Sequence, residues 1–128
     1  MARRPPEITV SIPAHPGYVH VLRAVVASVA ARLDWSFDEI EDLRLMVDEA
    51  CSRLVGPAGG AGTLRLRVII EDGGLTIEAS TDRRVDRWPS ADPGQALSRQ
   101  LLSALADEVR FAPVDGRPSV VLRKHRDR

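Results

Sequence analysis

The sequence has one cysteine, few aromatic residues and no excess of either charge. Cys51 has no second cysteine to pair with, so an intrachain disulfide is excluded, which agrees with a reducing cytoplasm. Lys and Arg total 18 and Asp and Glu total 18, so the formal net charge is zero. A protein that neutralises many phosphates usually carries a basic excess, so we expect no nucleic acid partner.

Long apolar runs are also missing. No stretch approaches the roughly 18 apolar residues that cross a bilayer, and residues 1–6 have no apolar segment behind their arginines. We therefore expect no membrane partner, no secretion signal and a cytoplasmic location. The 128 residues suit a single domain, and we expect residues 1–6 and 124–128 to be flexible.

What is present is a regular succession of hydrophobic patterns. Alternation predicts strands and a helical period predicts helices. The predicted order is a strand over 7–12, helices over 18–33 and 36–55, strands over 63–71 and 75–80, a helix over 93–106, and strands over 108–113 and 119–123. Strands in hairpins make a mixed or antiparallel sheet, and three helices can cover one face. The fold class is therefore an α/β (α+β) two-layer sandwich.

Most of the polar features have ordinary explanations. Ser36 and Glu39 form a capping box at the start of the second helix. The glycine-rich stretch 58–62 lacks the ending of a phosphate loop and leads into a strand, which favours a connector. The three histidines are scattered, so we expect no metal site, and Cys51 is expected to be a packed thiol.

Glu49 and Arg53 are the residues whose interpretation matters most. They are four apart on one helix, and an acid that precedes a base at this spacing favours an exposed ion pair worth a few tenths of a kcal/mol. Spacing alone therefore favours a surface salt bridge.

Particular residues also carry a resemblance to a known family. They are Ile12-Pro-Ala-His-Pro-Gly-Tyr-Val19, Asp38-Glu-Ile-Glu-Asp-Leu-Arg44, Val47-Asp-Glu-Ala-Cys-Ser52 and Leu105-Ala-Asp-Glu-Val-Arg110. In these segments the chain resembles the anti-sigma-factor serine kinases of the GHKL, or histidine-kinase-like, ATPase superfamily. The resemblance implies the Bergerat fold and one histidine-kinase-like ATPase domain over residues 1–128.

The resemblance assigns nucleotide chemistry to the second helix, where the family has Glu-x-x-x-Asn. Glu49 matches the glutamate, which acts as a base, but Arg53 replaces the asparagine that ligates magnesium. A guanidinium group has five donors and no acceptor, so it repels a cation instead of binding it. Glu49 is therefore expected to be a vestigial base, and magnesium is not expected to bind.

The glycine boxes of the family are also degraded. Asp82 matches the aspartate that reads adenine, but both glycines that should follow it are gone and arginines replace them. An alternative is that Arg53 and the pair Arg83 and Arg84 bind nucleotide phosphates directly, without a metal ion. In the second box Gly94 is kept and Ala96 replaces a glycine. We therefore expect a degenerate pocket made by Glu49, Arg53, Asp82, Gly94 and Ala96, which holds ATP or ADP weakly or not at all.

The resemblance also implies protein partners: a sigma factor, a competing anti-anti-sigma protein of the STAS type, and a second copy of the chain in a homodimer. Arg23 matches a basic position that the family uses for partner contact, although a solvated helix arginine is the alternative. Three hypotheses follow. The chain is a binding regulator with little or no catalysis, an active serine kinase that phosphorylates its anti-anti-sigma partner, or an unrelated α/β domain.

Overall fold

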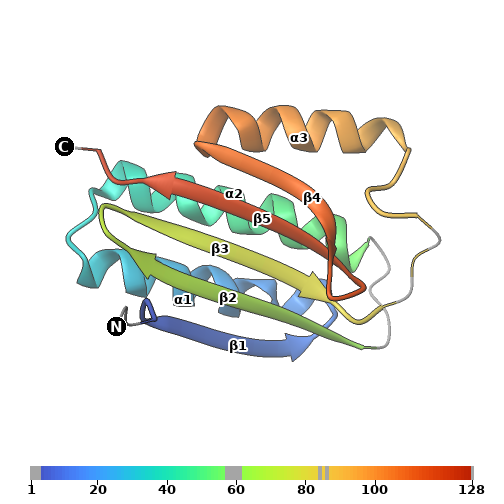
Figure 1. Cartoon of the computed structure of the whole chain (residues 1–128), viewed down its shortest axis with the longest axis horizontal. Helices are drawn as coiled ribbons and strands as arrows, with labels where there is room; N and C mark the ends of the chain where they lie inside the picture. Colours follow the sequence, from blue (N-terminus) through green and yellow to red (C-terminus); the bar gives the residue numbers. More distant parts are fainter. Residues whose placement is uncertain (1–3, 57–61, 84, 86, 128) are drawn as a thin grey trace.

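Five strands and three helices follow one another in the predicted order (Figure 1). The computed structural model describes residues 4–56, 62–83, 85 and 87–127. The elements are β1 (Glu7–Pro13), a 3-10 turn η1 (Pro16–Tyr18), α1 (Val19–Arg32), α2 (Phe37–Val55), β2 (Thr63–Glu71), β3 (Gly74–Thr81), α3 (Pro93–Leu105), β4 (Glu108–Val114) and β5 (Arg117–His125). Most of the predicted connector, residues 57–61, lies outside the described residues.

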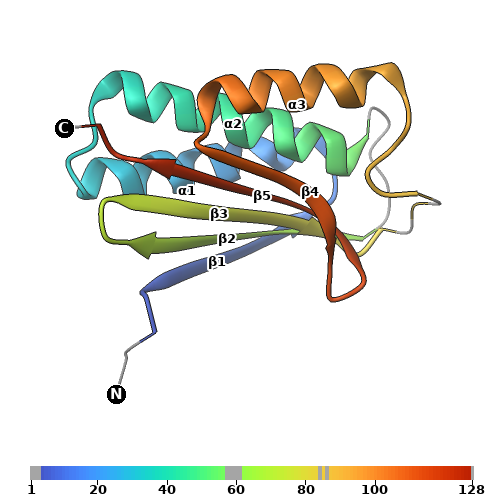
Figure 2. The ribbon, with the colours of Figure 1, turned by 45° about the horizontal axis from the view of Figure 1, so that its top comes forward.

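The strands form one sheet in the order β1-β2-β3-β5-β4. All four neighbouring pairs are antiparallel, so the sheet is antiparallel throughout and not mixed. The three helices lie together on one face of this sheet, and the opposite face carries no helix (Figure 2). The predicted two-layer sandwich is therefore confirmed.

The core lies between the helix layer and the sheet. Helix α2 occupies the middle of the helix layer, where it packs against α1, α3 and β3. Its inner face buries Leu43, Val47 and Leu54, which meet Leu66 and Ile77 of the sheet side within one cluster. Burying such a side chain contributes about 1.5–3 kcal/mol, so this face holds α2 firmly in position.

Both ends of α2 are defined by the sequence. The Ser36 hydroxyl accepts a hydrogen bond from the Glu39 amide at 3.2 Å, and the Glu39 carboxylate accepts one from the Ser36 amide at 2.8 Å. The predicted capping box is thus confirmed. Gly56 ends the helix with a φ of 79°, a conformation that side chains disfavour.

The C-terminal segment differs from the prediction of a frayed tail. Strand β5 continues through His125, two residues beyond the expected end. The Arg126 amide then donates to the Gly73 carbonyl at 2.7 Å, and the Asp127 amide donates to the Glu39 carboxylate at 2.5 Å. These backbone bonds tie residues 124–127 to the β2–β3 turn and the start of α2, contacts that charge composition does not indicate.

Two smaller expectations concern single side chains and membrane segments. Cys51 is fully buried. Burial is the main cause that raises the pKa of its thiol to about 12, and the nearby Asp48 carboxylate is a smaller one. It is therefore a packed, protonated thiol.

Among the described residues, no helix combines the length and the apolar character that a bilayer crossing requires.

Candidate functional site

Arg53 lies in the last turn of α2 and reaches across to the residues that precede α3. Its Nη2 donates to the Asp92 carboxylate, with Oδ2 at 2.8 Å and Oδ1 at 3.0 Å, and to the Ser90 hydroxyl at 2.7 Å. The Ser90 hydroxyl donates in turn to Asp92 Oδ2 at 2.6 Å. These three residues, here called the Arg53 cluster, link α2 to the segment between β3 and α3.

The charges of the Arg53 cluster support one another. The Arg53 side chain is 19% exposed and that of Asp92 is 50% exposed, so solvent partly screens this pair. Hydrogen bonds from Ser90 and then from Arg53 lower the pKa of Asp92 to about 2. Asp92 is therefore ionised at neutral pH, and the cluster carries balanced charge.

Gly94 lets the guanidinium lie against the first turn of α3. A Cβ at Gly94 would come within 2.8 Å of Arg53 Nη1 and 2.9 Å of Asp92 Oδ1. Real Cβ atoms do not approach so closely, so a side chain at this position would displace the Arg53 guanidinium and the Asp92 carboxylate. The positive group thus lies beside the first turn of α3.

Glu49 does not pair with Arg53, which corrects the salt bridge favoured by their spacing. Its carboxylate accepts a short hydrogen bond from the Ser98 hydroxyl of α3, while Arg53 turns to Asp92. Ser98 is 4% exposed, so Glu49 is held in the α2–α3 interface. The two residues share one side of α2, as predicted, but each binds a different part of the α3 region.

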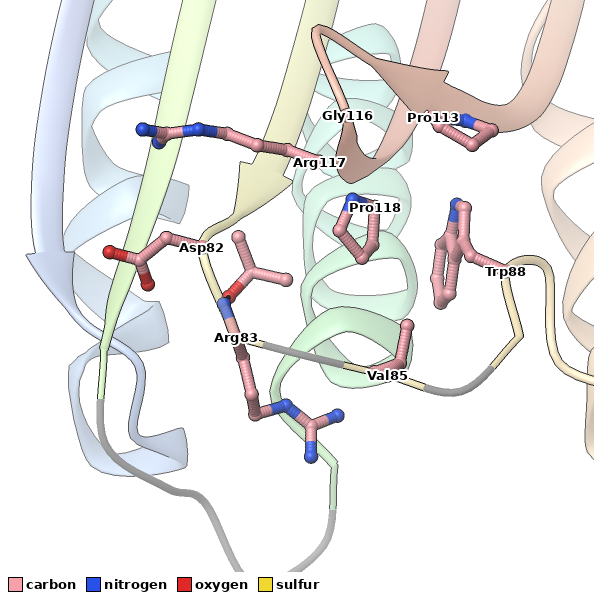
Figure 3. A pocket seen from close by; sticks show the side chains of 9 residues that line it. Asp82, Arg83, Val85, Trp88, Pro113, Gly116, Arg117 and Pro118 are labelled. Carbon is pink, nitrogen blue, oxygen red and sulfur yellow. Dashed lines mark hydrogen bonds between the residues drawn. The ribbon is translucent and has the colours of Figure 1, made fainter.

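Asp82 is placed elsewhere. Its Oδ1 accepts a hydrogen bond from the Thr63 amide at 2.7 Å, which ties the end of β3 to the start of β2. Figure 3 shows Asp82 directed toward β2, whereas the neighbouring Arg83 points toward the end of α2. Arg83 Nη2 donates to the Leu54 carbonyl at 3.2 Å, a favourable position for a cation at a helix C-terminus. Arg84, its partner in the sequence pattern, lies outside the described residues.

The predicted pocket residues therefore border different hollows. Glu49 and Arg53 line a hollow of about 480 Å³ between the start of α1 and the end of α2. Asp82 lines another of about 560 Å³, which Trp88 and Pro118 close from the other side (Figure 3). Ala96 lines a third of about 530 Å³ on α3. The structure brings Glu49, Arg53 and Gly94 together and leaves Asp82 apart from them. Ala96 lines a hollow that Ser90 and Asp92 of the Arg53 cluster also border.

Arg23 lies on α1 and its side chain reaches toward α2. Its Nη1 is 3.6 Å from Asp48 Oδ2, and its side chain is 36% exposed. Its buried Nε has no hydrogen-bond partner among the described residues. Arg23 is thus neither fully solvated nor firmly paired.

The resemblance to the kinase family implies a magnesium ion that accompanies ATP. Magnesium needs oxygen ligands, and Arg53 offers only donors at the position of the expected ligand. Asp92, the carboxylate nearest to it, is already neutralised by that arginine. The donor set of the Arg53 cluster does not fit a magnesium ion.

Sequence reasoning missed three functional contacts of this region: Ser90, Asp92 and Ser98. Asp92 precedes Pro93, a common pair at a helix start, and that signal could have identified Asp92 as the N-terminal cap residue of α3. Nothing local in the sequence marks Ser90 or Ser98 as partners of α2. Their roles depend on the packing of α3 against α2.

The comparisons with known proteins identify the class. The family described as histidine kinase-like ATPase domain matches residues 12–124. Because that match covers most of the chain, the protein belongs to the histidine kinase-like ATPase domain family. The architecture of one helix layer on an antiparallel sheet agrees with this membership.

Its relatives narrow the resemblance to one branch. The chain is 32% identical over 121 residues to the serine-protein kinase RsbW of Bacillus subtilis (strain 168), covering 80% of this chain and 76% of that protein. It is 26% identical over 133 residues to the RsbW of Bacillus thuringiensis (strain Al Hakam), covering 91% and 83%. It is 39% identical over 90 residues to the anti-sigma-F factor RsbW of Mycobacterium tuberculosis (strain CDC 1551 / Oshkosh), covering 70% of this chain and 52% of that protein.

A solved structure supports the fold. The crystal structure of the RsbU and RsbW domains of a Mycobacterium tuberculosis protein matches with a TM-score of 0.68 and 15% identity. The match covers 96% of this chain and 33% of that longer chain. This match supports the fold, and the relatives named RsbW confirm the resemblance to the anti-sigma-factor serine kinases.

Proposed function

We propose that this chain is an anti-sigma regulator that sequesters a sigma factor by direct binding and has little or no kinase activity. Its relatives carry the names serine-protein kinase and anti-sigma-F factor, so the family includes both activities. The Arg53 cluster favours the binding role. Its guanidinium has no acceptor that could hold the metal ion phosphoryl transfer needs, and its charge is already paired with Asp92.

The Arg53 cluster also gives a reason why nucleotide is not required. In this chain the guanidinium joins α2 to the start of α3 through Ser90 and Asp92. Glu49 and Ser98 join the same two helices one turn away. Internal bonds therefore hold α2 and α3 together without a bound ligand.

The partner surface is proposed to include Arg23, whose side chain is partly exposed and only loosely paired with Asp48. A homodimer is proposed to form through β1 and α1, because β1 is an edge strand whose residues are mostly exposed. Release is proposed to occur when an anti-anti-sigma protein of the STAS type competes for the bound surface.

An active serine/threonine kinase that phosphorylates an anti-anti-sigma protein is the second candidate. One observation favours it: Glu49 keeps the position of the family base and borders a hollow of about 480 Å³. In that case the Ser98 hydrogen bond would have to open before Glu49 could accept a proton from a substrate.

The test is binding without nucleotide. Each sigma factor of the source organism is purified and titrated with the chain, in the absence and in the presence of magnesium and ATP. We expect one sigma factor to bind at micromolar concentration or tighter, with the same affinity in both conditions, and to be displaced by a STAS-type protein. Binding that appears only with magnesium and ATP would favour the kinase.

A further inference from the structure

Exposed apolar side chains gather on the outer surface of α2 and α3, which lie beside each other in the helix layer (Figure 2). The described chain exposes six large apolar side chains, and four of them belong to these two helices: Phe37, Leu45, Leu97 and Leu101. Their exposed fractions are 76%, 54%, 67% and 42%. A single exposed leucine is ordinary, whereas several on neighbouring elements indicate a surface that binds another molecule.

Leu45 and Leu101 lie at the same level of the two helices. The Arg53 cluster joins the end of α2 to the segment before α3, and Glu49 meets Ser98 further along, so the helices run antiparallel. Leu45 is one turn before Glu49. Leu101 is about one turn after Ser98, and in antiparallel helices these two steps lead in the same direction. The two exposed leucines therefore face each other across the junction of α2 and α3.

The part of this surface that belongs to α2 is acidic. Four carboxylates and one exposed cation lie there: Asp38, Glu41, Asp42, Asp48 and Arg44. Three of the carboxylates approach Arg23, Arg44 or Lys124, but at 3.6 or 3.8 Å, which is longer than a hydrogen bond. Asp38 pairs with no cation among the described residues. These carboxylates, here called the acidic rim, therefore keep oxygens that can accept hydrogen bonds from outside.

Helix α3 adds no charge to this side. Its one charged residue is Arg99, whose guanidinium carbon lies 4.9 Å from the centre of the Phe111 ring on β4. Arg99 is two residues from both Leu97 and Leu101, so it does not face the same way on the helix. The surface thus combines an apolar centre shared by both helices with the acidic rim on α2.

The acidic rim distinguishes between occupants. A second copy of the chain docked through the same patch would bring like charges together, because a two-fold interface pairs a surface with itself. Anionic lipids and nucleic acid phosphates are repelled for the same reason. A helix with apolar residues on one face and Lys or Arg beside them matches both the centre and the rim. From Asp38 to Asp48 the rim extends about 15 Å along α2, which is close to three turns of such a helix.

We propose that the outer surface of α2 and α3 docks a basic amphipathic helix of a protein partner. The apolar face of that helix covers Leu45, Leu97 and Leu101, and its Lys or Arg side chains donate charge-assisted hydrogen bonds to the acidic rim. Arg23 meets this surface only at its edge, through Asp48. The inference goes beyond the proposed function, because it depends on neither a sigma factor nor a nucleotide.

The test uses three capped, fluorescently labelled peptides of about 15 residues. The first is an amphipathic helix with leucines on one face and lysines beside them. The second has the same composition in an order that breaks the apolar face, and the third keeps that face but carries glutamates instead of lysines. Each is titrated with the full chain while fluorescence anisotropy is recorded. We expect the first peptide to bind at least about tenfold more tightly than either of the others.

Leu101→Gln locates the binding surface. It should weaken binding of the first peptide at least about fivefold, because it removes an apolar contact from the centre. Ile8→Gln on β1 is the matched control, since Ile8 is 38% exposed and Leu101 is 42% exposed, and it should leave the affinity unchanged. Melting temperatures are measured for both variants. If Leu101→Gln proves less stable than the wild type, Leu97→Gln replaces it, because Leu97 is 67% exposed.

Four results would overturn the proposal. Equal binding of the first two peptides would show that charge alone attracts them, and equal binding of the first and third would show that the acidic rim plays no part. Unchanged affinity of the leucine variants would place the peptide elsewhere. Dimerisation of the free chain, or binding to anionic vesicles, that the same variants abolish would assign the surface to a second copy or to a membrane.

Discussion

At the residue scale, Arg53 stands at the end of α2 where the family resemblance implies an asparagine, and the two side chains differ in their chemistry. The side-chain oxygen of an asparagine can accept a hydrogen bond or ligate a cation, whereas the Arg53 guanidinium can only donate hydrogen bonds. The structure gives those donors to Ser90 and Asp92. An internal ion pair is therefore proposed to stand at this position in place of a metal ligand.

Restoring the asparagine should not restore catalysis. We expect Arg53→Asn to show no transfer of labelled phosphate from ATP to a STAS-type protein, because Asp82 still lies away from Glu49 and serves the Thr63 amide. A RsbW kinase with intact glycine boxes serves as the positive control. Transfer by the single variant would show that Arg53 alone blocks the reaction.

Arg23 provides the corresponding test of partner binding. Arg23→Glu should weaken binding of the sigma factor about tenfold, because it places a second negative charge beside Asp48. Arg32→Glu, at the far end of the same helix, is the matched control and should change the affinity little. Equal effects of the two variants would mean that only the overall charge of α1 matters.

At the element scale, α2 carries the candidate site at one end and its capping box at the other. Ser36→Ala should lower the free energy of unfolding by about 1 kcal/mol, measured by urea denaturation. Ser103→Ala, an exposed site on α3, is the control and should change it little. An unchanged value for Ser36→Ala would mean that the Asp127 amide alone keeps Glu39 in place.

The same end of α2 predicts a pH dependence. Burial raises the pKa of Glu39, but the hydrogen bonds from the Ser36 and Asp127 amides outweigh it and lower the pKa below 4.5. A lowered folded-state pKa means that this carboxylate stabilises the fold above pH 4.5 and loses that contribution as the pH falls. Glu39→Gln should therefore lower the melting temperature at pH 7 and should reduce the further fall in melting temperature below pH 4.5. Thermal denaturation at a series of pH values measures both effects.

The elements could be predicted because their signals are local. Alternation gave β2 its observed bounds, and the Ser36–Glu39 spacing located the start of α2. The partners of Arg53 and Glu49 could not be predicted, because Ser90 and Ser98 are 37 and 49 residues away along the chain. Spacing within one helix suggested that Glu49 and Arg53 pair with each other, and tertiary contacts prevailed over that suggestion.

At the scale of the whole molecule, two connections join α2 to the α3 region, and both are internal. The Arg53 cluster ties the end of α2 to the segment before α3, and Glu49 with Ser98 ties the helices themselves. In the described part of the chain, the sheet face opposite the helices carries no helix, and β1 and β4 are the edge strands. The protein is therefore a member of an ATPase family in which side-chain contacts link α2 to α3 and to the segment before it.

The most direct measurement is a calorimetric titration of ATP into the pure chain, with and without magnesium, beside the Arg53→Asn variant. The account predicts no magnesium-dependent heat for the wild type, because the donors of Arg53 meet Asp92 where a metal ligand would be needed. Binding of ATP that strengthens when magnesium is added would contradict it, and would return the chain to the active kinases of its family.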